Sequence, residues 1–383
     1  MKKTILVFTF LFSILDFGQT NVGYGLIDKK IDEIPINSTT STDEIARYIN
    51  ANFRTENDKI RAVFYWTASN ISYDVQNMYA INFNETSEKK IKKSLETRKG
   101  VCINYAEIFN EISNKVGVKS VVIEGYTKQN GSVANMAHAW CAAKIENKWY
   151  IFDPTWGSGG LYNGKFLKKI NNYYFKAEPS KIIASHIPFD FLWQFLYYPI
   201  TNQEFYDGKI QVNKLKKYFD FESEIGKFNT LSEIDKLTGE AERIEKNGVK
   251  NAMVFDRLSN KKSQIENYKI NQVISLYNEG ISELNEFINF RNKQFKPNVS
   301  DDELTRMIMS PKTKLLKSQE LLNKLESVDK SNLSNKNSIE KGLLGTIQQT
   351  EEQEIFVMKY LSKSKMIRKT MFTKVSWFGI PLN

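Results

Sequence analysis

Three side chains of the sequence have the types and the spacing for nucleophilic catalysis, and two of the three are scarce types. The chain has 383 residues but only two cysteines and two histidines. Cys102 lies in the stretch RKGVCINYAEIF, His138 lies in NMAHAWCAAKIE, and Asp153 closes KWYIFDPTW. A thiolate is a nucleophile, a neighbouring imidazole takes up and returns its proton, and a carboxylate behind the imidazole fixes its tautomer. The three residues are therefore a candidate catalytic set.

Cys102 stands where a Gly-Val turn runs into a helical pattern that ends at Gly117. A thiol at a helix N-terminus and beside an imidazolium has its pKa lowered from about 8.5 by several units. The backbone N–H of Cys102 would also provide one donor to an oxyanion hole. The helix is predicted from one apolar stripe: Ala106, Phe109, Ile112 and Val116.

Three strands of an antiparallel sheet are predicted after this helix, over residues 119–126, 137–146 and 148–153, with turn-like pieces between them. If the dipeptide EN is a two-residue hairpin turn, Asp153 falls opposite Trp140. Side chains alternate along a strand, so His138 shares the face of Trp140. We therefore expect His138 and Asp153 to be neighbours on one side of the sheet.

Cys141 is separated from His138 by an odd number of positions, so it points to the opposite face of the sheet. If Cys102 faces His138, it does not easily reach Cys141. A disulfide between the two cysteines stays open for an exported chain, but we favour Cys141 as a small buried apolar residue.

The surrounding elements follow from hydrophobic periodicity and composition. Residues 42–70 predict two helices broken near residues 54–58. Residues 78–96 are polar, with four lysines, and are expected to form a connection. Residues 154–205 are aromatic and rich in proline and glycine, which favours an irregular cover over the sheet.

Past residue 219 the composition shifts to Glu, Lys, Asn and Leu, with almost no strand pattern. Ser300 followed by Glu303 predicts a helix start, and residues 329–338 look like a linker. We expect an all-α region whose stripes form a bundle core, with a partner-binding coiled coil as the alternative. Three stripes predict three long helices: Ile265, Val273, Leu276, Ile281, Leu284 and Ile288; Leu315, Leu321, Leu322, Leu325 and Val328; Leu343, Ile347, Ile355, Met358 and Leu361.

The first residues carry two lysines, an apolar run from Ile5 to Leu15, and then small and polar residues, which predicts a signal peptide over residues 1–19. The mature protein is then expected to be secreted or periplasmic, and no later segment is long and apolar enough for an integral membrane span. The formal charge is +10, but the lysines are spread along the chain. That favours attraction to acidic envelope polymers and argues against nucleic acid as a partner.

The three motifs, in this order, resemble the Cys, His and Asp motifs of the transglutaminase-like superfamily. The stretch DKIRAVFYWTASNISYD is similar to the helix that precedes the cysteine motif in bacterial members, and YYFKAEPSKIIASHIPFDFLWQFLYYPIT is similar to an extension of the kyphoscoliosis-peptidase-like branch. The resemblance covers about residues 42–205. It implies an α+β fold, with a papain-like core of helices and antiparallel sheet over 42–207. The helical pattern described above adds an all-α helical domain over 219–383.

The resemblance implies Cys102 as nucleophile, His138 as general base and then acid, and Asp153 as orienting carboxylate. The reaction would be acyl transfer through a thioester on a protein or peptide substrate, with no cofactor. The kyphoscoliosis-like extension favours a peptidase or amidase over a cross-linking transglutaminase. Many relatives have Asn at the position of Cys141, a site that faces away from His138 in the expected register.

Other residues are weaker candidates. Trp66 and Tyr73 are candidates for a second oxyanion donor, although packing under the sheet is the simpler expectation for both. His186 lies far from any acidic motif in the sequence, so a structural role beside Trp193 and Gln194 is favoured. No metal-ligand spacing and no phosphate-binding loop is present.

A competing hypothesis is a non-enzymatic binding or scaffold protein of the cell envelope that keeps the same fold. In that case the helical C-terminal region would contact a protein partner. The presence of a scarce thiol and a scarce imidazole in matching motifs argues against it.

Overall fold

The protein is described by a computed structural model that covers residues 23–79, 85–325, 330–372, 374–375 and 381–382. The expected signal peptide, residues 1–19, lies outside the described residues. Within the described residues, no helix combines the length and the apolar character needed to cross a membrane.

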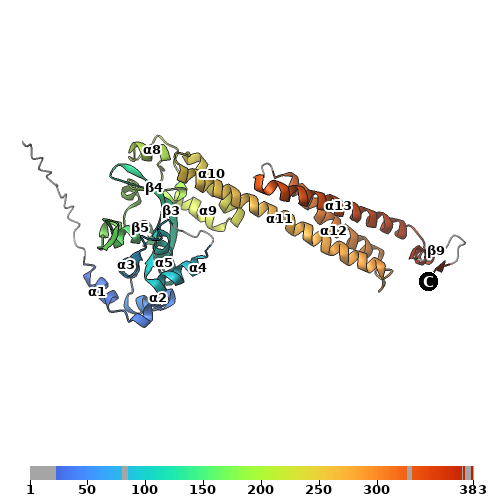
Figure 1. Ribbon diagram of the computed structural model, residues 1–383, viewed down its shortest axis with the longest axis horizontal. Coiled ribbons are helices and arrows are strands. Elements are labelled where there is room, and N and C mark those ends of the chain that lie inside the picture. Colours follow the sequence, from blue (N-terminus) through green and yellow to red (C-terminus); the bar gives the residue numbers. More distant parts are fainter. Residues whose placement is uncertain (1–22, 80–84, 326–329, 373, 376–380, 383) are drawn as a thin grey trace, which may run out of the picture. The chain divides into compact units, whose positions relative to one another are not determined.

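Contacts divide the chain into two compact units (Figure 1). Unit 1 comprises Met1–Thr230 and Glu242–Arg257, and unit 2 comprises Leu231–Ala241 and Leu258–Asn383. Unit 1 mixes helices with an antiparallel sheet and unit 2 is mainly helical, so the expected α+β class with a helical C-terminal region is confirmed. The domain limits 42–207 and 219–383 stay predictions.

A four-stranded antiparallel sheet in the order β5-β4-β3-β8 forms the centre of unit 1. The three predicted strands are present, and the predicted hairpin register is confirmed, since Ile145 pairs with Lys148 and Cys141 with Phe152. Asp153 follows the last paired residue. The fourth strand is three residues long and the sequence pattern does not predict it. The strands are β3 (Ser120–Gln129), β4 (Ser132–Ile145), β5 (Lys148–Phe152) and β8 (His186–Pro188).

Helices of the first half pack on one face of this sheet. Ala139, Cys141 and Ala143 of β4 share a buried core with Phe64 of α3 and Phe109 of α5. The predicted break between the first two helices is confirmed, because Thr55 caps the second one. These helices are α1 (Gly25–Asp32), α2 (Thr42–Asn52), α3 (Glu56–Asn70), α4 (Ser87–Thr97) and α5 (Cys102–Lys115).

The other face of the sheet is covered by later parts of unit 1. Trp140 and Ala142 of β4 pack there with Ile182, Leu192 and Phe221. As expected, the chain between the sheet and residue 205 is made of short pieces. They are α6 (Pro154–Ser158), β6 (Gly159–Tyr162), β7 (Lys165–Lys168), the 3-10 turns Asn172–Tyr174 and Phe191–Gln194, α7 (Pro179–Ile182) and α8 (Asn202–Asp207), followed by α9 (Phe221–Thr230). The next helix, α10 (Glu233–Asn247), is divided between the two units at Ala241.

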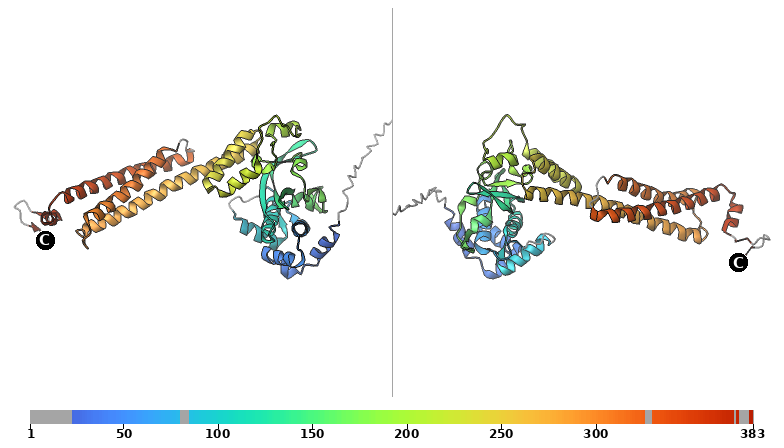
Figure 2. Two further views of the ribbon diagram at one scale, coloured as in Figure 1. Left: turned by 180° about the vertical axis from the view of Figure 1, so that it is seen from behind. Right: turned by 45° about the horizontal axis from the view of Figure 1, so that its top comes forward.

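The three expected long helices are present and run side by side in both views of Figure 2. The first begins in unit 1 and continues into unit 2 from Leu258, and Val328 of the second expected stripe lies outside the described residues. Ser300 begins the second of them, because its hydroxyl accepts a hydrogen bond from the Glu303 backbone N–H at 3.1 Å. The stripes meet in two buried clusters, one around Val273, Leu315 and Leu343 and one around Leu284, Leu304 and Val357. The helices are α11 (Ala252–Asn292), α12 (Asp301–Asn323) and α13 (Lys330–Leu361).

Three details of the sequence interpretation are wrong. The polar stretch before Cys102 contains helix α4, whose only buried residues are Ser94 and Leu95, so its apolar pattern is too weak to see. The linker-like residues 330–338 are helical, as the start of α13. Ile355 and Met358 are each 65% exposed, and Val357 takes the buried position of that turn.

Candidate active site

Cys102 is the first residue of α5 and is 6% exposed. Its helix begins there because the Asn104 Oδ1 accepts a hydrogen bond from the Val101 backbone N–H at 2.9 Å. This turn requires the glycine that precedes it, since a Cβ on Gly100 would lie 2.6 Å from the Cβ of Asn104. The backbone N–H of Cys102 belongs to the first helical turn, whose donors have no partner within the helix. It is therefore free to serve as a hydrogen-bond donor beside the thiol.

Tyr73 is brought to Cys102 by a two-stranded parallel pair, β1 (Ser72–Tyr73) and β2 (Lys99–Gly100), in which Tyr73 lies opposite Gly100. Burial raises the pKa of Tyr73 to about 12. The phenol is therefore a neutral O–H donor near the thiol. Trp66 differs, because it is fully buried and Arg98 lies 5.4 Å over its ring, so it fits the packing role.

His138 of β4 and Asp153 lie in direct contact, with 2.7 Å between His138 Nε2 and Asp153 Oδ2. The other ring nitrogen, Nδ1, is not bound by Asp153, and Cys102 is near enough to His138 to affect its pKa. Burial alone would lower the pKa of His138, but the Asp153 carboxylate and the Cys102 thiol together raise it to about 10. The imidazole is thus favoured in its protonated, charged form.

Asp153 is a buried carboxylate, and both of its oxygens accept hydrogen bonds. It caps α6, because Oδ1 accepts hydrogen bonds from the backbone N–H groups of Thr155 at 2.9 Å and Trp156 at 3.0 Å. Burial favours its neutral form, but the charge of His138 and the hydrogen bonds from both histidines hold its pKa well below the usual range. Asp153 therefore stays ionised although it is 1% exposed.

His186 lies far from any acidic motif in the sequence, but the fold brings it to Asp153. Its Nε2 lies 3.1 Å from Asp153 Oδ2, the same oxygen that contacts His138. The Gln194 side chain bonds the backbone of Ile200. Sequence reasoning missed His186 because its place depends on the short strand β8, which pairs with β3 far away in the chain.

The three side chains His138, Asp153 and His186 are close enough to be considered as a metal site, with ligand atoms within 4.8 Å of one another. In a tetrahedral zinc site, however, ligand atoms at bond lengths near 2 Å lie about 3.3 Å apart. The observed separations of 2.7 and 3.1 Å are hydrogen-bond distances. The arrangement therefore fits a hydrogen-bonded network, with Asp153 as the shared acceptor.

Cys141 lies in the core and away from this network. Both cysteines are free thiols, and Cys141 Sγ donates to the backbone oxygen of Ala106 at 3.1 Å. Burial raises the pKa of Cys141 well above its ordinary value. It is thus a neutral thiol packed between β4 and α5, as expected for a small buried residue.

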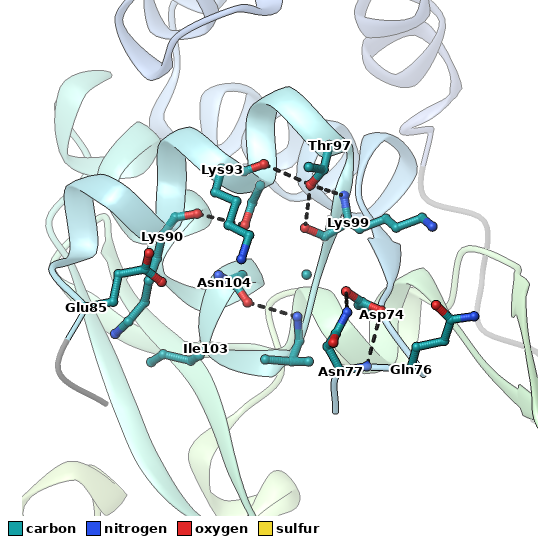
Figure 3. A pocket seen from close by; sticks show the side chains of 13 residues that line it. Asp74, Gln76, Asn77, Glu85, Lys90, Lys93, Thr97, Lys99, Ile103 and Asn104 are labelled. Atoms are coloured by element: carbon teal, nitrogen blue, oxygen red, sulfur yellow. Dashed lines mark hydrogen bonds between the residues drawn. The ribbon is translucent and has the colours of Figure 1, made fainter. Parts of the chain in front are cut away.

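A polar hollow of about 610 Å³ lies beside the start of α5 (Figure 3). Its lining includes residues on both sides of Cys102 in the sequence, among them Val101 and Ile103. Figure 3 shows Lys90 and Lys93 of α4 on one side of the hollow and Asp74 with Asn77 on the other. Lys90 is paired with the buried carboxylate of Glu107 at 3.3 Å. A hollow of this kind suits a polar ligand.

Comparison with known proteins shows which protein family this part of the chain resembles. Residues 43–154 match the family model of the transglutaminase-like superfamily, which confirms the resemblance expected from the three motifs. The chain is 31% identical over 156 residues to the kyphoscoliosis peptidase of Mus musculus, which covers 39% of this chain and 23% of that protein. It is 25% identical over 184 residues to hillarin of Drosophila melanogaster, which covers 42% of this chain and 22% of that protein. The chain thus spans about a quarter of the length of these relatives.

Among solved structures, the chain is similar to a candidate cysteine protease from Cytophaga hutchinsonii, with 21% sequence identity and a TM-score of 0.25. The match covers 34% of this chain and 42% of the Cytophaga chain.

Proposed function

We propose that the protein is a cysteine-dependent acyl-transfer enzyme in which Cys102, His138 and Asp153 act as nucleophile, acid–base and orienting carboxylate. The observation that carries the proposal is the contact of 2.7 Å between His138 Nε2 and Asp153 Oδ2, together with the effect of the nearby Cys102 on the pKa of this histidine. This is the order of parts that a thiol nucleophile needs for its activation.

The reaction would proceed in two halves. The Cys102 thiolate attacks the carbonyl carbon of a carboxamide or peptide, and His138 then gives its proton to the departing amine, which leaves a thioester. Water or a substrate amine next loses a proton to His138 and attacks the thioester, which releases the acyl group and restores the Cys102 thiolate beside a protonated His138. The imidazole therefore begins and ends each cycle in the same protonation state.

The negative oxygen formed during the attack needs hydrogen-bond donors that are already in place. The free backbone N–H of Cys102 is one candidate, and the O–H of Tyr73 is the second, because burial and the neighbouring thiol keep Tyr73 neutral. Trp66 is excluded from this role on our proposal, since it is fully buried and stacked under Arg98.

The substrate on this proposal is a protein or peptide with polar groups next to the reacting amide. The hollow at the start of α5 supports this, since amide and charged side chains line much of it. A peptidase or amidase is favoured over a cross-linking enzyme, by analogy with the name of the kyphoscoliosis peptidase relatives. Secretion, which the expected signal peptide alone supports, belongs to the same proposal.

A second candidate function is a binding or scaffold protein of the cell envelope. It is supported by exposed apolar side chains on α13, where Leu344 is 50% and Ile355 65% exposed, and which suit contact with a protein partner. None of the three candidate catalytic residues lies in unit 2. Partner binding that is unchanged in Cys102→Ala, with no turnover in the unaltered protein, would favour this function.

The experiment that tests the enzyme proposal incubates the full chain with casein and a labelled amine, with Cys102→Ala as control. New casein termini that depend on Cys102 support a peptidase. Incorporation of the amine that depends on Cys102 supports acyl transfer but overturns the preference for hydrolysis. Identical products from both proteins would refute the enzyme proposal.

Lys93→Glu, which changes the charge of the hollow, should alter the preference among peptides without removing the reaction.

A further inference from the structure

The only two histidines of the chain both contact one carboxylate oxygen. His138 Nε2 lies 2.7 Å and His186 Nε2 lies 3.1 Å from Asp153 Oδ2. The acyl-transfer steps proposed above use His138 and leave His186 without a task. Since His186 is 1% exposed, its polar ring is buried for a reason that the reaction so far does not give.

The fold places His186 through a close approach of two strands. His186 of β8 pairs with Thr127 of β3, and the neighbouring Gly125 pairs with His138 on one side and Pro188 on the other. A Cβ on Gly125 would lie 2.1 Å from the backbone oxygen of Ile187, so only glycine lets β8 come this near. The sheet thus holds both histidines around the same carboxylate.

The protonation of His186 follows from its neighbours. An ionised carboxylate accepts hydrogen bonds only, so the Nε2 that faces Asp153 must carry a hydrogen. Burial, together with the charge of His138, lowers the pKa of His186, which therefore stays neutral. A neutral ring with its hydrogen on Nε2 leaves Nδ1 as an acceptor, and the Ser185 hydroxyl lies 2.8 Å from it.

The remaining surroundings of His186 are aromatic and supply no further charge. The rings of Trp140, Trp156 and Tyr174 lie 5.1, 4.6 and 6.0 Å from the imidazole. Tyr174 is the one titratable group among them, and burial followed by the charge of Asp153 raises its pKa, so it is uncharged. Asp153 and His138 are therefore the charged groups that face His186 among these contacts.

We propose that His186 is a positioning residue, an uncharged donor that locks the Asp153 carboxylate so that Oδ2 stays directed at His138. Two backbone N–H groups already hold Oδ1, and the bond from His186 to Oδ2 removes the remaining freedom of the carboxylate to rotate. Because His186 is neutral, it fixes Asp153 without competing with the positive charge of His138. The inference rests on the proposed function, in which His138 must stay paired with Asp153.

The test uses nuclear magnetic resonance of the full chain labelled with ¹⁵N-histidine, which contains two imidazoles and hence two resolvable spin systems. We expect one ring, assigned by His186→Gln, to show the neutral form with hydrogen on Nε2 from pH 5 to pH 9. In His186→Leu, Asp153 is free to turn away, so the pKa of His138 should fall by about one pH unit. In His186→Gln the amide still donates without charge, so most of the effect should be reversed.

Several outcomes would overturn the inference. In the unaltered protein, these are a His186 ring with its hydrogen on Nδ1 or a charged His186 at neutral pH. In a folded His186→Leu protein, it is a His138 that titrates as before or at higher pH. A purely structural role would lower the melting temperature of His186→Leu without moving the titration of His138. If His186→Leu does not fold, the tautomer in the unaltered protein and the titration in His186→Gln still decide.

The readout needs no substrate, so it is separate from the proposed function. If the protein is inactive but His186 has the expected tautomer and His138 the expected titration, the enzyme proposal is refuted while the positioning role of His186 is supported. Once a substrate is known, His186→Leu should lower kcat by about tenfold to a hundredfold with little change in KM, because the lost bond orients a charged group. A loss confined to KM would contradict the inference.

Discussion

Cys102 and Cys141 lie in two regions of unit 1 that give the same side chain opposite surroundings. Cys102 begins α5, beside an imidazole, a phenol and an unpaired backbone donor. Cys141 lies in the middle of β4, is 0% exposed, and donates to the backbone oxygen of Ala106. Both are buried free thiols, so neither exposure nor bonding state separates them. Both belong to the same buried apolar cluster, and what separates them is that Cys102 has polar neighbours as well, among them His138 and Tyr73.

The difference shows that strand parity and helix position set the chemistry of these thiols. Cys141 is three residues from His138, but the alternation of the strand turns it toward α5 and the core. Cys102 is much further away in sequence, yet the first turn of α5 brings it to the same histidine. Burial in apolar surroundings raises the pKa of Cys141, so that it stays a thiol.

Replacing each cysteine in turn tests most directly whether the two thiols differ in function. Cys102→Ala should lower turnover of a peptide substrate by at least about 10⁴-fold, as expected for loss of a nucleophile. Cys141→Ala should leave turnover within about twofold and cost about 1 kcal/mol of unfolding free energy, the usual scale for a small core truncation. Steady-state kinetics and urea unfolding measure the two effects. Equal losses of turnover in both variants would mean that the two regions do not differ as argued.

The second prediction concerns the charge behind His138. Asp153→Asn keeps a side chain that still caps α6, but its amide no longer supplies a negative charge to the imidazole. We expect kcat to fall by about 10³-fold to 10⁴-fold and the pKa of His138 to move down toward its ordinary value. Turnover and the pH dependence of Cys102 alkylation, followed by intact mass, measure this.

Asp190→Asn is the matched control for that variant. Asp190 is also a buried carboxylate that accepts from a backbone N–H, in this case that of Leu192, and it pairs with Arg243 at 2.7 Å. Its loss should reduce stability and leave kcat unchanged. A similar fall of kcat in both variants would show that Asp153 acts through stability alone.

The sequence predicts much of this arrangement because the necessary information is local. The two-residue turn between β4 and β5 fixes the register, and the register brings Asp153 to His138. The apolar stripe of α5 likewise predicts the helix that begins at Cys102. These elements are each defined by residues that are close together in the chain, so their periodicity can be read directly.

The parts that the sequence does not predict depend on distant pairing or on weak patterns. Strand β8 has three residues, and its partner β3 lies far away in the chain, so no local pattern shows that His186 reaches Asp153. Helix α4 buries little apolar surface and therefore looks like a loop. Tyr73 is brought beside Cys102 by a two-residue strand pair, which is too short to have a recognisable pattern.

A smaller loss of kcat is expected when Tyr73 is changed, because its phenol is one of the polar neighbours that distinguish Cys102 from Cys141. Tyr73→Phe removes one proposed oxyanion donor and should lower kcat by about a hundredfold with KM unchanged. Tyr105→Phe is the control on α5, because it removes a buried hydroxyl that bonds the Ile71 backbone oxygen at 2.7 Å. The control should lose stability and keep kcat. If Tyr73→Phe also keeps kcat, the second donor lies elsewhere.

The smallest effect is a pH dependence of stability that arises only in the Cys102 region. The pKa of His138 is raised to about 10 in the folded state, above its ordinary value of 6.5. Below pH 6.5 both folded and unfolded states hold the proton, so the stabilising contribution is fully present. As the pH rises, the unfolded state releases the proton first, and the contribution declines until it is lost above the folded pKa.

The unfolding free energy of the unaltered protein, compared with His138→Gln, should therefore show an advantage of about 2 kcal/mol near pH 6 that declines toward pH 10. Urea unfolding at several pH values measures the difference, and Cys141→Ala, which leaves the network intact, should follow the unaltered protein. An advantage that stays constant or grows from pH 6 to pH 10 would mean that His138 is neutral in the folded state. Cys102 would then lie beside an uncharged base, and the contrast between the two thiols would rest on position alone.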